Sequence, residues 1–225
     1  MKMEFLLVLV VVLGVLVASC RDASEPQTVE AEQRTFSLTI AAVGDSLTAG
    51  YGVAESEAYP ALLETKLQSA GMDVRVVNAG VSGETTSGTL ARLDWVLTLD
   101  PDIVILETGA NDGLRGLDPV MVRDNLQQII DILQGKDIVV VLAGMKMVWN
   151  LGPAYTGEFN RIYPDLAAEK KLIFMPFFLQ GVATDPALNL DDGIHPNQAG
   201  YRIIADNILP FVREAITVAG NNAAR

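Results

Sequence analysis

Ser46 follows Gly44 and Asp45 at the point where an apolar segment of the chain meets a turn. A serine at the carboxyl end of a strand and at the start of a helix is well placed for nucleophilic attack, because helix-start amides favour developing negative charge. A serine at such a position can equally be a helix N-cap, which is common after strands. The rest of the chain has to decide between these two interpretations.

His195 is the one histidine in the 225-residue chain. A serine nucleophile needs a base, usually histidine, and a third group that holds this base in one tautomer. If the chain uses this chemistry, His195 is therefore the base. Asp192 is the preferred third group, because a separation of three residues across a turn can bring both side chains to one side, and Gly193 permits the turn. Asp191 and Asp45 remain alternatives, and His195 could instead be a surface or capping residue.

Three groups could stabilise the oxyanion that forms when a serine attacks an ester carbonyl. They are the backbone N–H groups of Ser46 and Gly80 and the side-chain amide of Asn111. Gly80 would allow a close approach of the backbone, although it could be a plain turn glycine. Asn111 begins the sequence Asn-Asp-Gly, which is also typical of a turn stabilised by an asparagine side chain.

Apolar segments alternate five times with segments of helical periodicity. Strands are expected at residues 38–43, 74–78, 103–107, 138–142 and 172–175. Helices are expected at residues 56–70, 85–99, 119–134 and 156–170, followed by a last helix that starts near 196 or 197 and runs past 209, where Pro210 kinks or interrupts it. This alternation predicts an α/β fold with a parallel sheet that helices cover on both faces.

The candidate residues follow different strands of this sheet. Ser46 follows the first strand, Gly80 the second, Asn111 the third, and the segment 192–195 the fifth. Ligands of such folds bind at the carboxyl ends of the strands. Polar residues with purely structural roles would not be expected to gather at one edge of the sheet.

The amino-terminal segment has the composition of an export signal. Residues 5–18 form an uncharged apolar run of 14 residues after Lys2, whereas a bilayer-spanning helix needs about 20. The run ends in Val-Ala-Ser-Cys at 17–20, which resembles the lipobox of bacterial lipoproteins and implies cleavage before Cys20 and acylation of this residue. An ordinary signal peptide or an uncleaved anchor is the alternative.

These features predict a lipoprotein that is exported and membrane-anchored through acylated Cys20, facing the periplasm or the cell exterior. The predicted divisions are a lipoprotein signal peptide at 1–19, a flexible polar spacer at 20–36, one domain at 37–218 and a disordered tail at 219–225.

Charge and cysteine content exclude several classes of partner. The formal net charge of −12 argues against nucleic acid and against electrostatic docking on anionic lipid, both of which need clustered Lys and Arg. The single cysteine excludes an intramolecular disulfide and a cysteine-based zinc site. We expect a monomer.

Four blocks of the sequence together resemble the GDSL, or SGNH, hydrolase family. They are Gly-Asp-Ser-Leu at 44–47, Gly80, Gly-Ala-Asn-Asp at 109–112 and Asp-Gly-Ile-His-Pro-Asn at 192–197. Their order and spacing match the family, and the resemblance covers residues 38–212. One such block is weak evidence, whereas four in register are specific.

This resemblance implies a flavodoxin-like three-layer α/β/α sandwich, the SGNH hydrolase fold, with a five-stranded parallel sheet in the order 2-1-3-4-5. It implies Ser46 as nucleophile and Asp192 and His195 as the rest of a catalytic triad. It assigns Ser46, Gly80 and Asn111 to the oxyanion hole, and it implies no metal and no organic cofactor. Ala110 departs from the family, where a second glycine is expected.

Large apolar side chains gather near the expected site, some of them on the loop 144–155. The candidates for a substrate pocket are Leu114, Met145, Met147, Trp149 and Phe178, although such residues can simply be core. They favour a small lipid-like or aryl ester substrate. The sequence therefore predicts a serine esterase for carboxylic esters, with thioesters as a second bond type, of the lysophospholipase, thioesterase or arylesterase kind.

Two other functions stay open. A carbohydrate O-acetylesterase of the same family should have a shallow, polar site. A non-catalytic lipid-binding lipoprotein would lack activity on simple esters.

The α/β-hydrolase fold is excluded. Its nucleophilic serine lies in a G-x-S-x-G pattern, and the nearest candidate, at 80–84, fails because Glu84 replaces the last glycine.

Overall fold

The computed structural model describes residues 36–147 and 151–223. The predicted signal peptide, the predicted acylation site Cys20 and nearly all of the predicted spacer lie outside these residues, as does Trp149. Within the described part of the chain, no helix combines the length and the apolar character needed to cross a membrane.

Five parallel strands form one sheet, in the order β2-β1-β3-β4-β5, which confirms the predicted topology. The third strand has the predicted bounds, and the others differ from the prediction by one or two residues at an end. The strands are β1 (Leu38–Gly44), β2 (Val74–Gly80), β3 (Ile103–Glu107), β4 (Val139–Ala143) and β5 (Ile173–Met175). Every residue of β3 is buried, as expected for a central strand that is covered on both faces.

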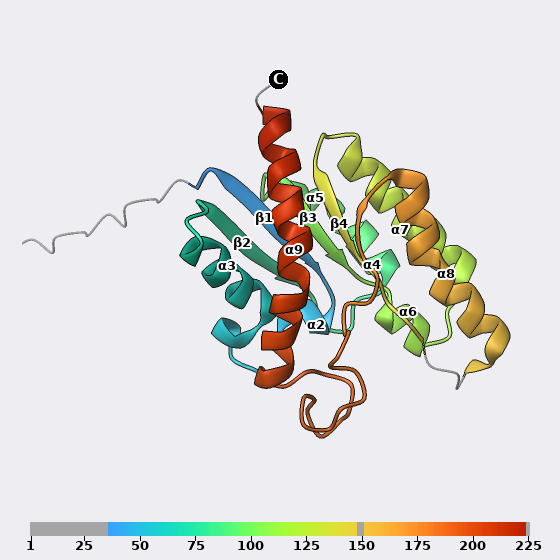
Figure 1. The fold of residues 1–225 in the computed structure, drawn as a ribbon. Helices are drawn as coiled ribbons and strands as arrows, with labels where there is room; N and C mark the ends of the chain where they lie inside the picture. The colour runs from blue at the N-terminus through green and yellow to red at the C-terminus, as the bar shows by residue number, and fades with distance from the viewer. Residues whose placement is uncertain (1–35, 148–150, 224–225) are drawn as a thin grey trace, which may run out of the picture. The chain divides into compact units, whose positions relative to one another are not determined.

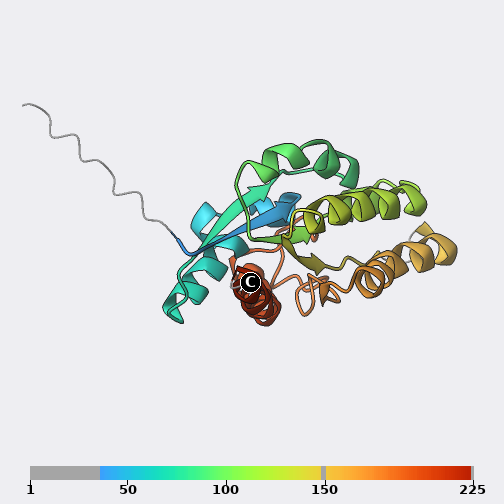
Figure 2. The ribbon, with the colours of Figure 1, turned by 90° about the horizontal axis from the view of Figure 1, so that it is seen from above.

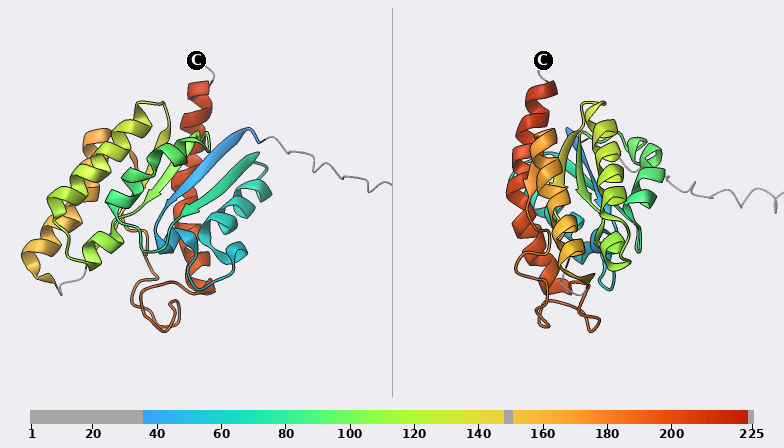
Figure 3. Two further views of the ribbon diagram at one scale, coloured as in Figure 1. Left: turned by 180° about the vertical axis from the view of Figure 1, so that it is seen from behind. Right: turned by 90° about the vertical axis from the view of Figure 1, so that its right-hand side faces the viewer.

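Helices cover both faces of the sheet (Figures 1 and 2). Helices α3 and α9 lie on one face, and α4, α5 and α7 lie on the other, with α8 packed against α7. The two helical layers, with the sheet between them, are seen from the side in Figure 3. The helices are α2 (Ser46–Ala49), the 3-10 turn η1 (Glu55–Glu57), α3 (Tyr59–Ser69), α4 (Thr86–Ala91), α5 (Leu93–Leu97), α6 (Ala110–Leu114), α7 (Pro119–Gln134), α8 (Pro153–Lys170) and α9 (Gln198–Ala223).

Local sequence explains the bounds of α7, which match the prediction. The Asp118 carboxylate accepts a hydrogen bond from the N–H of Val120 at 2.9 Å, and Pro119 occupies the first turn, where its missing N–H costs nothing. The apolar stripe of the helix is buried against the sheet and α8. Its residues are Val122, Leu126, Ile129, Ile130 and Leu133.

The single helix predicted at 85–99 is wrong, because the structure divides it into α4 and α5 at Arg92. The guanidinium of Arg92 donates to the Glu84 carboxylate at 2.6 Å and to the carbonyl oxygen of Ala79 at 2.7 Å. These contacts with the loop after β2 hold Arg92 at the break, where it ends one helix and precedes the next.

The last helix is longer than predicted. Asn197 caps its start, since its side-chain oxygen accepts from the N–H groups of Ala199 at 2.9 Å and Gly200 at 3.1 Å. The helix continues past Pro210 without interruption. It reaches Ala223, beyond the predicted domain end at 218, because Ala219 still packs into the core.

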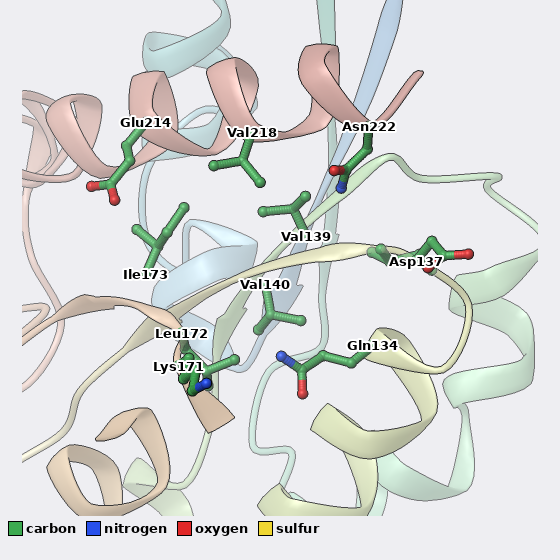
Figure 4. A pocket seen from close by; sticks show the side chains of 11 residues that line it. Gln134, Asp137, Val139, Val140, Lys171, Leu172, Ile173, Glu214, Val218 and Asn222 are labelled. Carbon is green, nitrogen blue, oxygen red and sulfur yellow. The ribbon is translucent and has the colours of Figure 1, made fainter. Parts of the chain in front are cut away.

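A hollow of about 390 Å³ lies at the amino ends of β4 and β5 (Figure 4). Figure 4 shows side chains of β4 and β5 opposite Glu214, Val218 and Asn222 of α9. None of the predicted site residues lines this hollow. The candidate residues lie instead beyond the carboxyl ends of the strands.

Candidate active site

Asp45 and Gly44 together determine the turn that carries Ser46. Asp45 caps α2, and its Oδ1 accepts from the N–H of Leu47 at 2.9 Å. Gly44 has no room for a side chain, because a Cβ atom there would lie 2.2 Å from the carbonyl oxygen of Glu107 and 2.2 Å from Oγ1 of Thr48. The main chain can therefore turn sharply out of β1 and place Ser46 at the start of α2.

Ser46, His195 and Asp192 form one chain of hydrogen bonds. Oγ of Ser46 lies 2.9 Å from Nε2 of His195, although the two residues are 149 positions apart. Nδ1 of His195 lies 2.7 Å from Oδ2 of Asp192. Oδ1 of Asp192 accepts from the N–H groups of Ile194 at 2.9 Å and His195 at 3.0 Å. The turn that contains Gly193 thus directs both side chains to one side, as the spacing predicts.

Hydrogen bonds favour the ionised form of Asp192. The N–H and the ring of His195, together with the N–H of Ile194, lower the pKa of Asp192 to about 2. A carboxylate beside Nδ1 fixes the tautomer in which Nδ1 carries the proton and Nε2 is free to accept one from Ser46. Of the two alternatives, Asp45 contacts Leu47 and Asn111, and Asp191 lies at an exposed position in the loop.

Two of the three predicted oxyanion donors have other partners in this structure. Gly80 pairs with Gly44 in the sheet, and its N–H donates to Oδ1 of Asn78 at 3.0 Å. The side-chain amide of Asn111 donates to Oδ2 of Asp45 at 3.1 Å and to the carbonyl oxygen of Glu84 at 3.0 Å. Asn111 lines the same hollow as Ser46 and His195, and Gly80 does not.

Another carboxyl group, that of Glu107, is buried against Thr48 of α2. Glu107, at the end of β3, is fully buried, and its Oε2 accepts from Oγ1 of Thr48 at 2.7 Å. Burial, and then the nearby charge of Asp45, raise the pKa of Glu107 well above its ordinary value. Burial also raises the pKa of Asp45, from 3.8 to about 6. The sequence analysis missed Glu107, although a carboxyl group at the end of an apolar strand is a usable signal.

A hollow of about 480 Å³ opens beside Ser46 and His195. Three of the predicted pocket residues line it, namely Leu114, Met145 and Met147. The prediction for Phe178 is wrong: this ring is fully buried and packs edge-on against Tyr59, with 5.2 Å between ring centroids. Phe177, one residue earlier, lines the hollow in its place.

The sequence analysis also missed other lining residues. Lys146 lines the hollow and lies over the Phe177 ring, 5.1 Å from its centroid. Ile194, between Asp192 and His195, lines it as well. Most of the lining is apolar, which suits the hydrocarbon part of a small molecule. Among the described residues, no group of three or more His, Cys, Asp and Glu side chains is arranged to hold a metal ion.

The sequence model of the GDSL-like lipase/acylhydrolase family matches residues 42–203. The chain belongs to this family. It is therefore an enzyme of the GDSL/SGNH hydrolase group, whose blocks the sequence analysis identified. The match spans β1 to α9 and includes Ser46, Gly80, Asn111, Asp192 and His195.

Named relatives are similar over most of the chain. Esterase TesA of Pseudomonas aeruginosa is 38% identical over 80% of this chain and 90% of its own length. Arylesterase of Vibrio mimicus is 41% identical over 73% and 82%, respectively. Thioesterase 1/protease 1/lysophospholipase L1 of Escherichia coli is 41% identical over 75% and 80%.

Solved structures of GDSL/SGNH enzymes have the same fold. The crystal structure of TesA superposes with a TM-score of 0.75 at 38% identity, over 79% of this chain and 99% of that chain. AlinE4, an SGNH-hydrolase family esterase, superposes with a TM-score of 0.68 at 43% identity, over 81% and 98%. The predicted fold class is therefore confirmed.

Proposed function

We propose that this protein hydrolyses carboxylic esters of lipid-like or aryl substrates, with thioesters as a second bond type. The observation that carries the proposal is the hydrogen-bonded chain from Ser46 through His195 to Asp192. The names of the relatives, which include an esterase, an arylesterase and a thioesterase/lysophospholipase, support the same chemistry.

The reaction follows from the positions of these atoms. Oγ of Ser46 attacks the ester carbonyl carbon while Nε2 of His195 takes its proton. When the tetrahedral intermediate collapses, the bond from the carbonyl carbon to the alcohol oxygen breaks and Nε2 returns the proton to the leaving alcohol. Water then releases the acid from Ser46 by the same steps, and Asp192 stabilises the imidazolium each time.

The oxyanion requires hydrogen-bond donors, two of which have other partners in this structure. We assign the N–H groups of Ser46 and Gly80 and the amide of Asn111 to this task. The oxyanion competes with Asp45 and Glu84 for the Asn111 amide and with Asn78 for the Gly80 N–H. Hydrogen bonds in catalytic sites often become well aligned only when substrate binds, so this competition is compatible with the assignment.

The apolar hollow beside Ser46 supports an acyl or aryl group over a sugar. Its lining by Leu114, Met145 and Met147 differs from the shallow, polar site expected of a carbohydrate O-acetylesterase. A non-catalytic lipid-binding protein would have no need for the hydrogen bond between Ser46 and His195.

Ester hydrolysis by the full-length protein tests the proposal. We expect turnover of 4-nitrophenyl esters, and a fall of about 10³-fold or more in kcat for Ser46→Ala. A panel of lysophospholipid, acyl-CoA, aryl acetate and acetylated sugar then compares substrate classes. Fastest turnover of the acetylated sugar would contradict the substrate assignment, and undiminished activity of Ser46→Ala would contradict the mechanism.

We also propose that the protein is an exported monomer, anchored to the membrane through acylated Cys20 and facing the periplasm or the cell exterior. The apolar run at 5–18 and the Val-Ala-Ser-Cys sequence at 17–20 support this location. Growth of producing bacteria with labelled palmitate tests it: label should enter the full-length protein but not Cys20→Ser. Light scattering of the purified chain in detergent tests the monomer.

A further inference from the structure

Tyr51 lies against the ring of His195. The two ring centroids are 4.5 Å apart, with an angle of 41° between the ring planes. The N–H of Tyr51 donates to the carbonyl oxygen of Ser46 at 3.1 Å, so the turn after α2 ties Tyr51 to the nucleophile. About half of the Tyr51 surface, 52%, remains exposed to solvent. The ring is therefore held beside His195 and is still free to contact a substrate.

The loop that carries Tyr51 packs against the loop that carries His195. Gly52 packs against Leu190 so closely that a Cβ atom on Gly52 would lie 2.3 Å from Cδ1 of Leu190. The N–H of Leu190 in turn donates to the carbonyl oxygen of His195 at 2.8 Å. Tyr51 therefore belongs to the wall of the site.

Two hollows are lined by neighbouring residues of the segment 192–195. The first is the apolar hollow already described, which Ser46 and His195 line together with Leu114 and Met145. The second is a more open depression, which Tyr51 and Asp192 line together with Gly52, Asn189, Leu190, Asp191 and Asn197. The contact between the two rings thus lies between the hollows, since His195 lines the first and Tyr51 lines the second.

The stereochemistry of ester cleavage separates the two halves of a substrate. The tetrahedral carbon on Ser46 carries the oxyanion, the acyl chain and the leaving alcohol in three different directions. The alcohol oxygen has to face Nε2 of His195, because this nitrogen returns the proton to it. The body of the alcohol then lies near the His195 ring, where Tyr51 and the second hollow are located.

We propose that the hollow beside Tyr51 binds the alcohol half of the ester and that the Tyr51 ring selects planar aromatic alcohols, while the apolar hollow beside Leu114 binds the acyl half. The proposal rests on the esterase function proposed above and adds to it a site for the leaving group. An exposed aromatic ring favours a flat aromatic partner by stacking.

Two variants and four esters test this division. The esters combine acetyl or octanoyl acyl groups with 4-nitrophenol or ethanol, and each variant of the full-length protein is compared with the unaltered protein on the same ester, so that intrinsic reactivity cancels. We expect Tyr51→Ala to lower kcat/KM about tenfold for both aryl esters and less than about twofold for the ethyl esters. Tyr51→Phe keeps the ring and should restore kcat/KM to within about twofold.

Leu114→Ala is the matched control, since Leu114 is equally exposed, at 53%, but lines the apolar hollow. It should lower the preference for octanoyl over acetyl and leave the preference for the aryl alcohol unchanged. The proposal would be overturned if Tyr51→Ala and Leu114→Ala changed the preference for octanoyl over acetyl, and the preference for 4-nitrophenol over ethanol, to the same extent.

Separate measurement of kcat and KM for Tyr51→Ala distinguishes two roles of Tyr51, namely binding the alcohol and positioning His195. Release of the acyl group from Ser46 involves no alcohol but still needs His195, so kcat under deacylation-limited conditions should be unchanged in Tyr51→Ala while KM rises. An equal fall of kcat on all four esters would overturn the proposal, because it would mean that Tyr51 only positions His195. Ser46→Ala is measured alongside. Undiminished activity of this variant would show that the esterase mechanism itself is wrong, separately from the result for Tyr51.

Discussion

The carboxylate of Asp45 accepts a hydrogen bond from the side-chain amide of Asn111, with 3.1 Å between Oδ2 and Nδ2, across 66 positions of sequence. The same carboxylate caps α2 through the N–H of Leu47. The residue that holds the Ser46 turn thus also holds the proposed oxyanion donor. Asp45 is nearly fully buried at this junction, and its protonation therefore affects both stability and the site.

Asp45 should make the protein less stable as the pH rises from about 4 to about 6. Burial raises its pKa from 3.8 to about 6, so the folded protein binds the proton more tightly than the unfolded chain. The resulting stabilisation is fully present below the unfolded pKa and is lost as the pH rises through the folded pKa, a change of about 3 kcal/mol.

Urea unfolding of the unaltered protein and of Asp45→Asn between pH 4 and pH 7 measures this effect. As the pH rises, the free energy of unfolding of the unaltered protein should fall by about 3 kcal/mol relative to that of Asp45→Asn. Other groups such as Asp192 titrate in both proteins, so their contributions largely cancel in this difference. A difference that stays constant across the range would contradict the raised pKa.

Glu107 should tolerate replacement by glutamine but not by alanine. Glutamine has nearly the same size, is neutral like the protonated acid, and can accept the hydrogen bond that Thr48 donates at 2.7 Å. We expect Glu107→Gln to change the free energy of unfolding at pH 7 by less than about 1 kcal/mol, and Glu107→Ala to lower it by about 2–4 kcal/mol through a cavity and a lost hydrogen bond. Thermal or urea unfolding distinguishes the two. An equal loss for both variants would show that the folded protein needs the ionised carboxylate.

Gly80→Ala should damage both stability and activity. A Cβ atom at this position would lie 2.2 Å from the backbone nitrogen of Ala49 and 2.7 Å from its Cα. Since backbone atoms cannot give way cheaply, we expect a loss of about 2 kcal/mol or more in the free energy of unfolding. The esterase rate should fall as well, because α2 carries Ser46.

Gly157→Ala provides the control for that substitution. This glycine lies in α8 and is exposed, and a Cβ atom there would meet nothing within 4 Å beyond the helix's own backbone. Alanine should raise the free energy of unfolding by about 0.5–1 kcal/mol through its better helix propensity. Similar losses for the two variants would argue against the close contact at Gly80.

Asp192→Asn should slow ester hydrolysis far more than Asp191→Asn. The asparagine amide can donate toward Nδ1 of His195 and so favour the wrong tautomer, which should lower kcat by about 10³–10⁴-fold. Asp191 is the exposed neighbour that the sequence left as an alternative, and its replacement should change kcat less than about twofold. Steady-state rates on a 4-nitrophenyl ester separate the two. A larger effect at Asp191 would reassign the third group.

The sequence by itself determined the fold class and the candidate catalytic residues. Apolar segments that alternate with helical periodicity predicted the parallel sheet, the resemblance to the GDSL/SGNH family supplied its strand order, and the cap at Asp118 sets the start of α7. Such features depend on neighbouring residues in the chain, which is why they can be recognised locally. Because the chain has one histidine, serine chemistry left His195 as the base without any coordinates.

Only the tertiary structure decided which side chains surround the site and which hydrogen bonds are already made. Phe177 lines the hollow while Phe178 is buried, the Tyr51 ring lies on His195, and the Asn111 amide is bound to Asp45. The direction of a side chain after a strand or in a loop depends on partners that are distant in sequence. Those partners come together only when the whole sheet and its helices pack, so no local pattern specifies them.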